Sequence, residues 1–266
     1  MRVLQCDVLI VGTGPAGCAA AITARRLGLK VIAIDRATFP RDKCCGDGLT
    51  TLALRELESL GLTPSASSWL TINDAYIRSP SGRELHLPLP RDRGQYAAIV
   101  KRIELDADLV DLMRDEGADV HQGCAFTTIE LNAQGVQVLL DDGQSILARN
   151  VIAANGMWSP VRKALGCGPV GYRGDWHGFR QYVKAEGPQS RNLWVWFDKD
   201  LLPGYAWSFP LADGQVNLGF GVVRGSRLNG KKLASVWAGL LDRPAIKQAL
   251  GHATPQDSRT AWPIPA

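Results

Sequence analysis

The chain lacks any apolar run close to the roughly 18 residues that a bilayer-spanning helix requires, although 45% of its 266 residues are hydrophobic. This absence excludes an integral membrane helix and leaves peripheral attachment open. A secretory signal is absent as well, because Asp7 interrupts the N-terminal apolar stretch. We therefore expect a cytoplasmic protein with reduced thiols. Peripheral attachment at the inner membrane surface is the alternative location.

Metal-binding patterns and blocks of one charge are missing too. The formal net charge is +4, the basic residues are scattered, and no nucleic-acid-binding motif is present, so we expect no nucleic-acid partner. The four histidines are isolated and no two of the six cysteines form a Cys-x-x-Cys pair, so we expect no metal site. With 21% charged residues, the composition is that of an ordinary globular protein of one large or two small domains.

The segment from Asp7 to Asp35 contains a complete dinucleotide-binding fingerprint. An apolar run of strand length leads into Gly-x-Gly-x-x-Gly, an alanine-rich stretch that favours helix follows, and a second apolar strand ends on an acidic residue. Gly12 permits a tight turn, Gly14 lets backbone N–H groups approach a pyrophosphate, and Gly17 allows helix and strand to pack closely. The phosphates would lie at the helix N-terminus, and Asp35 can accept hydrogen bonds from a ribose hydroxyl.

This motif does not distinguish NAD from FAD. The alternative to dinucleotide binding is a glycine-rich strand–helix turn in an unrelated α/β protein.

The rest of the chain predicts an α/β domain interleaved with a mostly antiparallel β domain. Helical patterns cover residues 50–61, 101–117 and 231–250, residues 72–89 form a predicted hairpin, and alternating or aromatic strands follow at 178–183, 193–197, 206–210 and 216–222. Because the hairpin interrupts the α/β pattern, we assign it to the β domain. The predicted boundaries are 1–71 and 90–168 for the first domain, 72–89 and 169–258 for the β domain, and 259–266 for the start of a return to the first domain.

Several segments resemble the geranylgeranyl reductase family, a branch of the FAD-dependent fold shared with aromatic-ring hydroxylases. The resemblance covers essentially the whole chain, and its most specific part is the segment from Pro203 to Pro210, which is similar to the family's substrate-tunnel motif. The other segments are Asp35-Arg36 and residues 39–43, 45–49, 100–102 and 155–162. The resemblance implies a fold with an FAD-binding Rossmann-like domain and a β-sheet substrate domain. It also implies FAD as cofactor, with NAD(P)H or a reduced electron carrier as reductant.

The resemblance also implies a set of site residues. The cofactor-binding residues are Gly12, Gly14, Pro15, Ala16, Gly17, Asp35, Arg36, Cys45, Gly46, Asp47, Gly48, Leu49, Arg102, Ala125, Asn155 and Gly156, and the catalytic residues are Cys45, Tyr205 and Trp207. Cys45 would lie at the isoalloxazine edge, with a small buried hydrophobe as the alternative. Arg102 would face the flavin phosphates or the ribityl chain, with a surface arginine at a helix start as the alternative.

Aromatic residues alternate along the segment that resembles the tunnel motif. Tyr205, Trp207 and Phe209 would share one face of a strand and form an apolar wall, although such a face more commonly belongs to a core. Trp194 and Trp196 form a second aromatic pair on a nearby strand. A polyprenyl chain suits such a lining, because each buried CH₂ group contributes about 0.8 kcal/mol.

The chain departs from the family at three places. Cys44 precedes Cys45 where relatives usually carry another residue, and we treat it as incidental because a vicinal disulfide is strained. Asn155 stands where relatives usually carry aspartate. This replacement keeps the capacity for hydrogen bonding but removes a negative charge. The chain ends with residues 259–266. In relatives such a segment leads to a Gly-Asp segment that would contact the flavin pyrophosphate and ribityl chain. We therefore expect a fragment or a truncated reading frame with weak FAD binding.

The expected function is FAD-dependent reduction of carbon–carbon double bonds in an isoprenoid chain, either a geranylgeranyl group or the prenyl tail of a lipid quinone. The alternatives are a flavin monooxygenase or halogenase of the same fold, and a non-catalytic remnant that binds lipid or a partner. Halogenases carry Trp-x-Trp-x-Ile-Pro where this chain has Tyr205, Trp207, Phe209 and Pro210, which favours the reductase. The expected partner is a long apolar isoprenoid substrate. Peripheral membrane contact and an electron-donor protein are left open.

Overall fold

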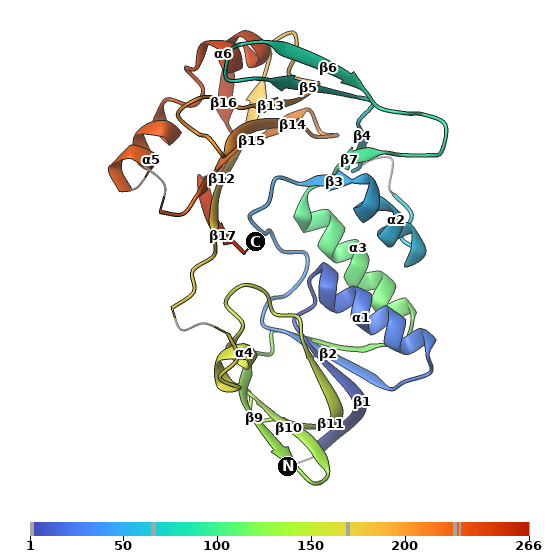
Figure 1. The fold of residues 1–266 in the computed structure, drawn as a ribbon. Coiled ribbons are helices and arrows are strands. Elements are labelled where there is room, and N and C mark those ends of the chain that lie inside the picture. The colour runs from blue at the N-terminus through green and yellow to red at the C-terminus, as the bar shows by residue number, and fades with distance from the viewer. Residues whose placement is uncertain (1–2, 65–67, 169–170, 226–227, 229, 266) are drawn as a thin grey trace. The chain divides into compact units, whose positions relative to one another are not determined.

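Backbone contacts divide the chain into two compact units, each assembled from segments that are distant in the sequence (Figure 1). The computed structural model describes residues 3–64, 68–168, 171–225, 228 and 230–265. The first unit comprises Met1–Asp42, Leu57–Leu62 and Ile103–Tyr172, and the second comprises Lys43–Glu56, Thr63–Arg102 and Arg173–Ala266. The predicted fold class, an α/β domain interleaved with a mainly antiparallel β domain, is confirmed.

The compact units and the predicted domain boundaries divide the chain differently at several segments. Residues 43–56 and 90–102 belong to the second unit, whereas the sequence boundaries assign them to the first domain. The segment at 260–264 pairs with a strand of the second unit. The predicted boundary after residue 168 falls at residues 169–170, which lie outside the described residues.

The first unit is built on a six-stranded sheet with the order β8-β2-β1-β11-β10-β9. The strands from β8 to β11 run parallel, and β10 and β9 continue the sheet in antiparallel pairs. The bounds are β1 (Val3–Val11), β2 (Val31–Asp35), β8 (Asp119–Gln122), β9 (Phe126–Asn132), β10 (Gly135–Leu140) and β11 (Ser145–Ala153). The two apolar runs of the fingerprint are therefore adjacent parallel strands in the interior of the sheet.

Helix α1 (Pro15–Arg26) starts inside the fingerprint, with Pro15 in the first turn, where its missing N–H group is not needed. Its buried residues, Gly17, Cys18, Ala21, Ile22 and Ala24, are mostly small, which lets the helix lie close to β1 and β2. Figure 1 shows α3 (Arg102–Asp115) beside α1, and Arg25 Nε donates to the carbonyl of Glu116 just beyond α3 at 3.1 Å. A short helix, α4 (Pro160–Ala164), is capped by Ser159.

The second unit is organised around an eight-stranded sheet with the order β16-β12-β15-β14-β13-β5-β6, in which β17 also pairs with β12. Its bounds are β5 (Asp74–Arg78), β6 (Glu84–Pro88), β12 (Trp176–Ala185), β13 (Leu193–Trp196), β14 (Tyr205–Pro210), β15 (Gln215–Val223), β16 (Ala253–Pro255) and β17 (Thr260–Ile264). Only the β13–β5 pair is parallel among these described strands. A small sheet of the order β3-β7-β4 contains β3 (Gly48–Thr50), β4 (Leu70–Thr71) and β7 (Ala97–Ile99), and α2 (Thr51–Ser59) follows β3.

The predicted hairpin at 72–89 is confirmed as β5 and β6. The helical pattern predicted at 231–250 corresponds to two helices, α5 (Gly230–Ala238) and α6 (Pro244–Leu250). Proline lacks the N–H group that a continuing helix would need, so Pro244 begins a new helix.

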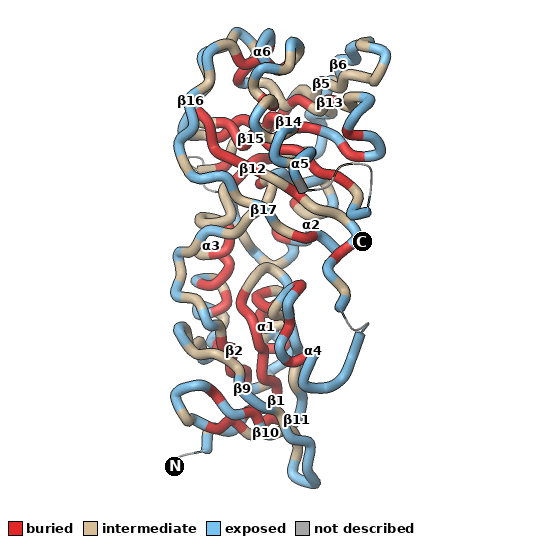
Figure 2. Tube along the Cα trace, turned by 90° about the vertical axis from the view of Figure 1, so that its left-hand side faces the viewer, coloured by how far each residue is buried: buried red, intermediate tan, exposed pale blue. Residues whose placement is uncertain are grey.

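The two faces of the eight-stranded sheet carry different side chains. Trp194 lies opposite Ser208 and Trp196 opposite Ala206, so both tryptophans point away from the face that carries Trp207. They are 2% and 1% exposed, stack on each other at 5.5 Å, and belong to the apolar core that includes residues of α6. Figure 2 shows this buried interior along β12, β14 and β15. The interpretation of the tryptophan pair as part of the same lining as Trp207 is therefore wrong.

Asp257 fills a gap beside β12 between the places where β16 and β17 pair with it. Its Oδ1 accepts the backbone N–H of Tyr182 at 2.8 Å, which replaces a strand carbonyl. Its Oδ2 lies 2.5 Å from Nη1 of Arg180, a side chain that is only 1% exposed. One carboxylate thus satisfies a backbone donor and a buried charge.

Asp257→Ala should lower the free energy of unfolding by about 3 kcal/mol, because it leaves the buried Arg180 charge without this carboxylate. Asp257→Asn keeps an acceptor for the Tyr182 N–H and should cost less. Urea denaturation followed by tryptophan fluorescence measures both changes. Equal stability of wild type and Asp257→Ala would contradict this role.

Candidate functional site

The three glycines of the fingerprint turn have different surroundings in the first unit. A Cβ on Gly12 (φ +100°) would lie 2.6 Å from the carbonyl oxygen of Ala154, and one on Gly17 would lie 1.8 Å from the carbonyl oxygen of Gly12. Backbone packing therefore requires both glycines. A Cβ on Gly14 would meet only Nη2 of Arg41, at 3.8 Å, and the φ of Gly14 is an ordinary −73°. Gly14 is thus not required by the protein's own packing, and it leaves room for a ligand to approach the backbone.

Asp35 ends β2 beside this turn. Its Oδ2 accepts hydrogen bonds from the backbone N–H of Thr13 at 2.7 Å and from the Thr13 hydroxyl at 3.3 Å, and its Oδ1 accepts the Ala37 N–H at 2.9 Å. The carboxylate therefore braces the turn, and it retains lone pairs for a ribose hydroxyl. The neighbouring Arg36 is exposed.

Arg41 is a candidate site residue to which sequence reasoning assigned no role. Its Nη1 lies 2.7 Å from Oδ2 of Asp106 on α3, a side chain that is 0% exposed, and its guanidinium stacks over the Phe39 ring at 4.8 Å. These contacts hold a positive charge next to Gly14. The motif at 39–43 contained the signal, but only the packing of α3 shows where the guanidinium points. Together with the N-terminus of α1, Arg41 makes this turn favourable for a pyrophosphate.

Asn155 and Gly156 follow β11, and the Cα of Asn155 lies beside Gly12. Among the described residues, neither Nδ2 nor Oδ1 of Asn155 has a hydrogen-bond partner, although both atoms are buried. An unsatisfied buried amide is costly, so this amide suits the polar atoms of a ligand. Ala125 lies near the end of β2, since the N–H of Cys124 donates to the carbonyl of Asp35 at 2.9 Å. The predicted residues of the first unit thus gather around the turn, and the open cradle at Gly14 and the unpaired amide fit a dinucleotide.

In the second unit, residues 45–49, which we call the Cys45 loop, lie on aromatic side chains of β14. A Cβ on Gly46 would approach Phe209 to 3.5 Å and Trp207 to 3.7 Å, and one on Gly48 would approach Phe209 to 3.1 Å. Because these glycines have no side chain, the loop backbone reaches the rings directly. The structure therefore brings the predicted residues of this loop together with two residues of the aromatic strand.

A buried hydrogen-bond network fixes this arrangement. Asn217 of β15, which is 0% exposed, donates from Nδ2 to the carbonyl of Cys45 at 2.8 Å and to Oδ2 of Asp47 at 2.8 Å. Its Oδ1 accepts the indole N–H of Trp207 at 3.0 Å. The hydroxyl of Tyr182 also donates to Oδ2 of Asp47, at 2.7 Å. Asn217 and Tyr182 were missed at the sequence level, because no motif marks them.

Asp47 is 2% exposed and adopts the left-handed region with φ +63°. Burial raises the pKa of this carboxyl group from 3.8 to about 6, and hydrogen bonds from Tyr182 and Asn217 and the nearby charge of Arg180 only partly oppose that effect. The backbone N–H of Arg102, at the start of α3, also acts on the carboxylate. The loop therefore contains a carboxyl group that titrates near neutral pH.

The predicted catalytic side chains differ in accessibility. Trp207 is 8% exposed, and its ring lies over Gly219, where a Cβ would approach Cζ2 to 2.4 Å. Tyr205 is 37% exposed, with its ring centroid 6.1 Å from that of Trp207, so its hydroxyl is the more accessible group. Cys45 is half-buried. Cys44 accepts a hydrogen bond from the Thr260 hydroxyl at 3.5 Å, and burial raises the pKa of its thiol.

The described residues include neither a membrane-spanning helix nor a metal-binding cluster. None of their helices has both the length and the apolar character needed to cross a bilayer. No group of three or more histidine, cysteine, aspartate or glutamate side chains in the described part of the chain could hold a metal ion.

The strand–turn–helix–strand core, the open glycine cradle and the unpaired amide define a dinucleotide-binding type of α/β protein. The chain belongs to the FAD-binding domain family, whose model matches residues 5–199. It is 35% identical over 242 residues to menaquinone reductase of Mycolicibacterium smegmatis, an alignment that covers 82% of this chain and 55% of the relative. It is 30% identical over 271 residues to digeranylgeranylglycerophospholipid reductase 2 of Methanopyrus kandleri, covering 95% and 63% respectively.

The fold also matches a solved structure. A geranylgeranyl bacteriochlorophyll reductase-like protein from Thermoplasma acidophilum superposes with a TM-score of 0.83 at 21% identity, covering 98% of this chain and 66% of that protein. This likeness concerns the fold. The chain spans between about half and two thirds of the length of these relatives.

Gly14→Val should weaken FAD binding at least tenfold while the protein stays folded, because the added side chain blocks the backbone approach but meets no protein atom closer than Arg41. Titration of FAD followed by flavin fluorescence measures the affinity. Gly17→Ala is the contrasting variant, since its Cβ clashes with the Gly12 backbone and should lower the stability of the fold itself. Unchanged FAD affinity in a folded Gly14→Val protein would contradict the assignment.

Asp47 should make stability depend on pH. Since its folded-state pKa lies near 6, above the ordinary 3.8, the folded state binds the proton more tightly, and the unfolding free energy should fall by about 3 kcal/mol as pH rises from about 4 to above 6. Asp47→Asn should abolish this contribution, because an amide does not titrate in this pH range. The network should be kept, because the amide oxygen can still accept from Tyr182 and Asn217. Denaturation at several pH values tests this.

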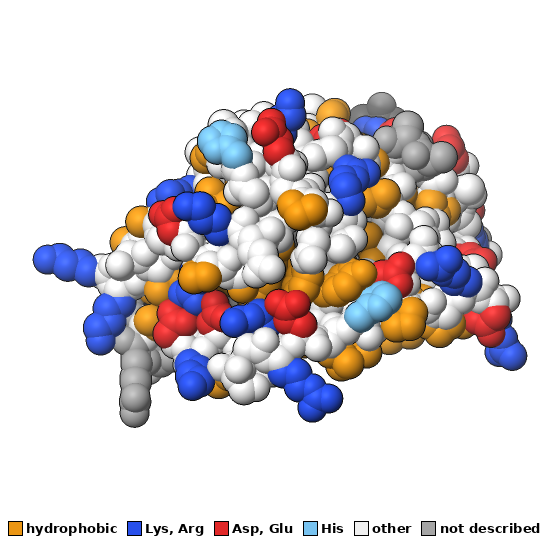
Figure 3. Space-filling view, turned by 90° about the horizontal axis from the view of Figure 1, so that it is seen from above, with side chains coloured by type: hydrophobic (Ala, Val, Ile, Leu, Met, Phe, Trp, Pro, Cys, Tyr) orange, Lys and Arg blue, Asp and Glu red, His pale blue; other side chains and the backbone are white. Residues whose placement is uncertain are grey.

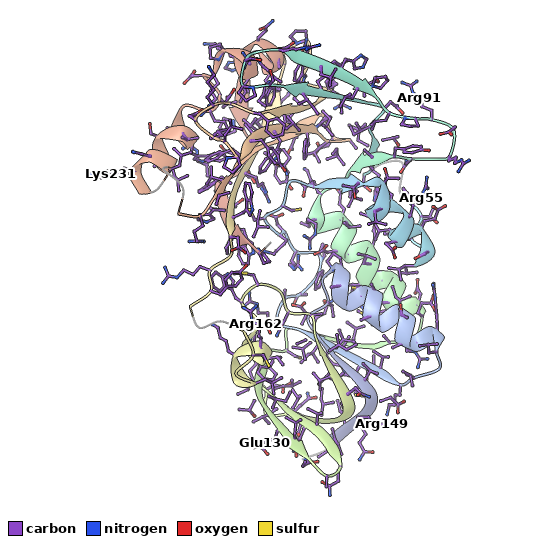
Figure 4. The ribbon with its side chains drawn as sticks, in the orientation of Figure 1. Arg55, Arg91, Glu130, Arg149, Arg162 and Lys231 are labelled. Atoms are coloured by element: carbon purple, nitrogen blue, oxygen red, sulfur yellow. The ribbon has the colours of Figure 1, made fainter. Side chains whose placement is uncertain are left out.

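The matched control for the pH dependence is Glu130→Gln, a change at an exposed residue of β9 in the first unit (Figure 4). It should leave the wild-type dependence in place. A similar pH slope for wild type and Asp47→Asn would show that Asp47 does not titrate in this range.

Proposed function

We propose that this chain provides the FAD-binding and substrate-facing parts of a reductase that acts on carbon–carbon double bonds of an isoprenoid chain. The substrate would be a geranylgeranyl group or the prenyl tail of a lipid quinone. The observation that carries the proposal is the packing of the Cys45 loop on Trp207 and Phe209, which brings the predicted flavin-contacting loop to the aromatic strand. The names of the two reductase relatives support the substrate class.

The residues of the first unit would hold the adenosine and pyrophosphate part of FAD. The N-terminus of α1 and the guanidinium of Arg41 supply positive charge beside Gly14. Asp35 would accept a hydrogen bond from the ribose, and the Asn155 amide would find partners on the ligand. The mixture of backbone donors and one fixed cation suits a diphosphate rather than a single carboxylate.

The residues of the second unit would act at the reacting end. When bound and reduced, FAD supplies a hydride to one carbon of the alkene. The other carbon takes a proton from Tyr205, Cys45 or water, so each reduced double bond gains two hydrogen atoms. Trp207 and Phe209 would exclude water with their apolar rings, and Tyr205 would present its hydroxyl from the exposed end of the same strand face. NAD(P)H or a reduced electron carrier would restore the reduced cofactor.

A lipid substrate would also bring the protein to a membrane surface. Figure 3 shows charges of both signs mixed with apolar side chains over one face, without a block of one sign. We therefore propose that peripheral contact follows from capture of the lipid itself rather than from a polybasic patch. An electron-donor protein remains part of the proposal as the alternative to direct reduction by NAD(P)H.

The reductase should add two hydrogen atoms per double bond to menaquinone or geranylgeranyl diphosphate. The test uses purified protein with FAD that has been reduced chemically without oxygen, so no electron donor has to be known. The extracted lipid is then oxidised in air, which returns any quinol ring to the quinone, and mass spectrometry detects the hydrogen atoms that remain on the prenyl chain. Tyr205→Phe should lower the rate about tenfold or more, because general acid catalysis contributes about 10²–10⁴-fold when one group supplies the proton.

The matched control for that rate is Tyr96→Phe, which removes an exposed hydroxyl bonded to Asp92 and should leave the rate unchanged. If neither lipid gains mass while reduced FAD is demonstrably bound, the proposed substrate class is wrong.

A further inference from the structure

The side-chain amide of Asn217 connects the Cys45 loop with the aromatic strand β14. It contacts the backbone of Cys45, the carboxylate of Asp47 and the indole of Trp207, at distances of 2.8, 2.8 and 3.0 Å. Asn217 is fully buried, and these three contacts use both ends of its amide. No motif of the sequence includes this residue.

The orientation of the amide is determined by its neighbours. An indole N–H can only donate, so the atom facing Trp207 must be Oδ1. The Cys45 carbonyl can only accept, and so can the ionised carboxylate of Asp47, so Nδ2 must face them. A flipped amide would place like groups against each other at all three contacts. The network therefore has one arrangement, and movement of Trp207 or of the loop disturbs the other.

The network holds the backbone on the C-terminal side of Cys45. Its carbonyl is bonded to Asn217, and two residues further on the Asp47 carboxylate is bonded to Asn217 and Tyr182. The carbonyl of Asp47 accepts the N–H of Val100 at 3.1 Å. The backbone that follows the Cys45 side chain is thus fixed at several points, while the Cys45 residue is half-buried.

We propose that Asn217 is a positioning residue for Cys45, which sets where the thiol lies and makes that position depend on the packing of Trp207. The inference rests on the proposed function for the role of Cys45 in turnover, but the positioning itself does not. If Trp207 moves when a substrate chain lies against it, the amide passes that movement to the loop. Asn217 thereby links the substrate wall to the reacting group without touching substrate.

The test measures how fast iodoacetamide alkylates Cys45 in the folded protein. Every sample carries Cys44→Ser, Cys124→Ser and Cys167→Ser, because Cys6 and Cys18 are buried and Cys45 is then the one remaining thiol that is not. Asn217→Leu removes all three hydrogen bonds at similar volume, and Asn217→Asp removes the donor but keeps an acceptor for Trp207. Both should raise the labelling rate about tenfold, the equivalent of about 1.4 kcal/mol of lost restraint. Trp207→Phe removes the indole N–H together with part of the ring but leaves the two Nδ2 hydrogen bonds of Asn217 in place, so it should raise the rate by a smaller factor.

Ser208→Ala is the matched control, because Ser208 is as fully buried as Asn217. It lies on the same strand as Trp207 but on the opposite face. Its hydroxyl has no partner among the described residues. Its labelling rate should stay within about twofold of the parent, since no restraint on the loop is lost. Parent-like labelling in folded Asn217 variants, or an equal rise in Ser208→Ala, would overturn the proposal. If the Asn217 variants do not fold, Tyr182→Phe decides in the same way, because it removes one donor to Asp47 and keeps the ring.

Labelling needs neither flavin nor substrate, so its result stands even if the proposed reduction is not observed. Where reduction is observed, the Asn217 variants should lower kcat about tenfold while KM and FAD affinity stay within about threefold. A fall in FAD affinity without a change in labelling would mean that Asn217 supports only the fold, and the proposal would be wrong.

Discussion

The buried contact between Asn217 and Asp47 is the constraint on which the site of the second unit depends. A carboxylate and an amide without water must find partners inside the protein, because each unsatisfied group costs about 1–3 kcal/mol. This requirement explains why Tyr182, Trp207 and the Cys45 carbonyl all converge on these two side chains. It also explains the glycines around them, since Gly46 and Gly219 leave the space in which the loop backbone and the indole ring can lie close to their neighbours.

The first unit places backbone donors and a positive charge at the Gly14 turn and leaves the space in front of them open. Gly12 and Gly17 are needed for the contact of turn, helix and strand, whereas Gly14 leaves open space. Arg41 is held in place by a fully buried aspartate on α3, so its charge is directed before any ligand arrives. Preorganised charge of this kind lowers the cost of binding, because fewer side chains must be ordered on association.

The two faces of the eight-stranded sheet have different surroundings. Trp194, Trp196 and the residues around them form a core with α6, and their rings are almost fully buried. The opposite face carries the aromatic strand residues Trp207 and Phe209 with the polar network beside them. Period-two alternation makes this division possible within one strand. The same alternation means that substitutions at neighbouring positions of β14 should have unrelated effects.

The sequence by itself determined the fingerprint unit, the hairpin of β5 and β6, and the alternation of aromatic residues on β14, because each depends on residues close together in the chain. It could not show that Trp194 and Trp196 face the other way, since that follows from the register of β13 on β14. Nor could it identify Asn217, Tyr182 or the direction of Arg41. Asn217 contacts the Cys45 loop across 172 residues of sequence, and Arg41 is oriented by a buried aspartate on another element. Only tertiary packing decides such contacts, because local propensity carries no information about which distant donor will meet a buried acceptor.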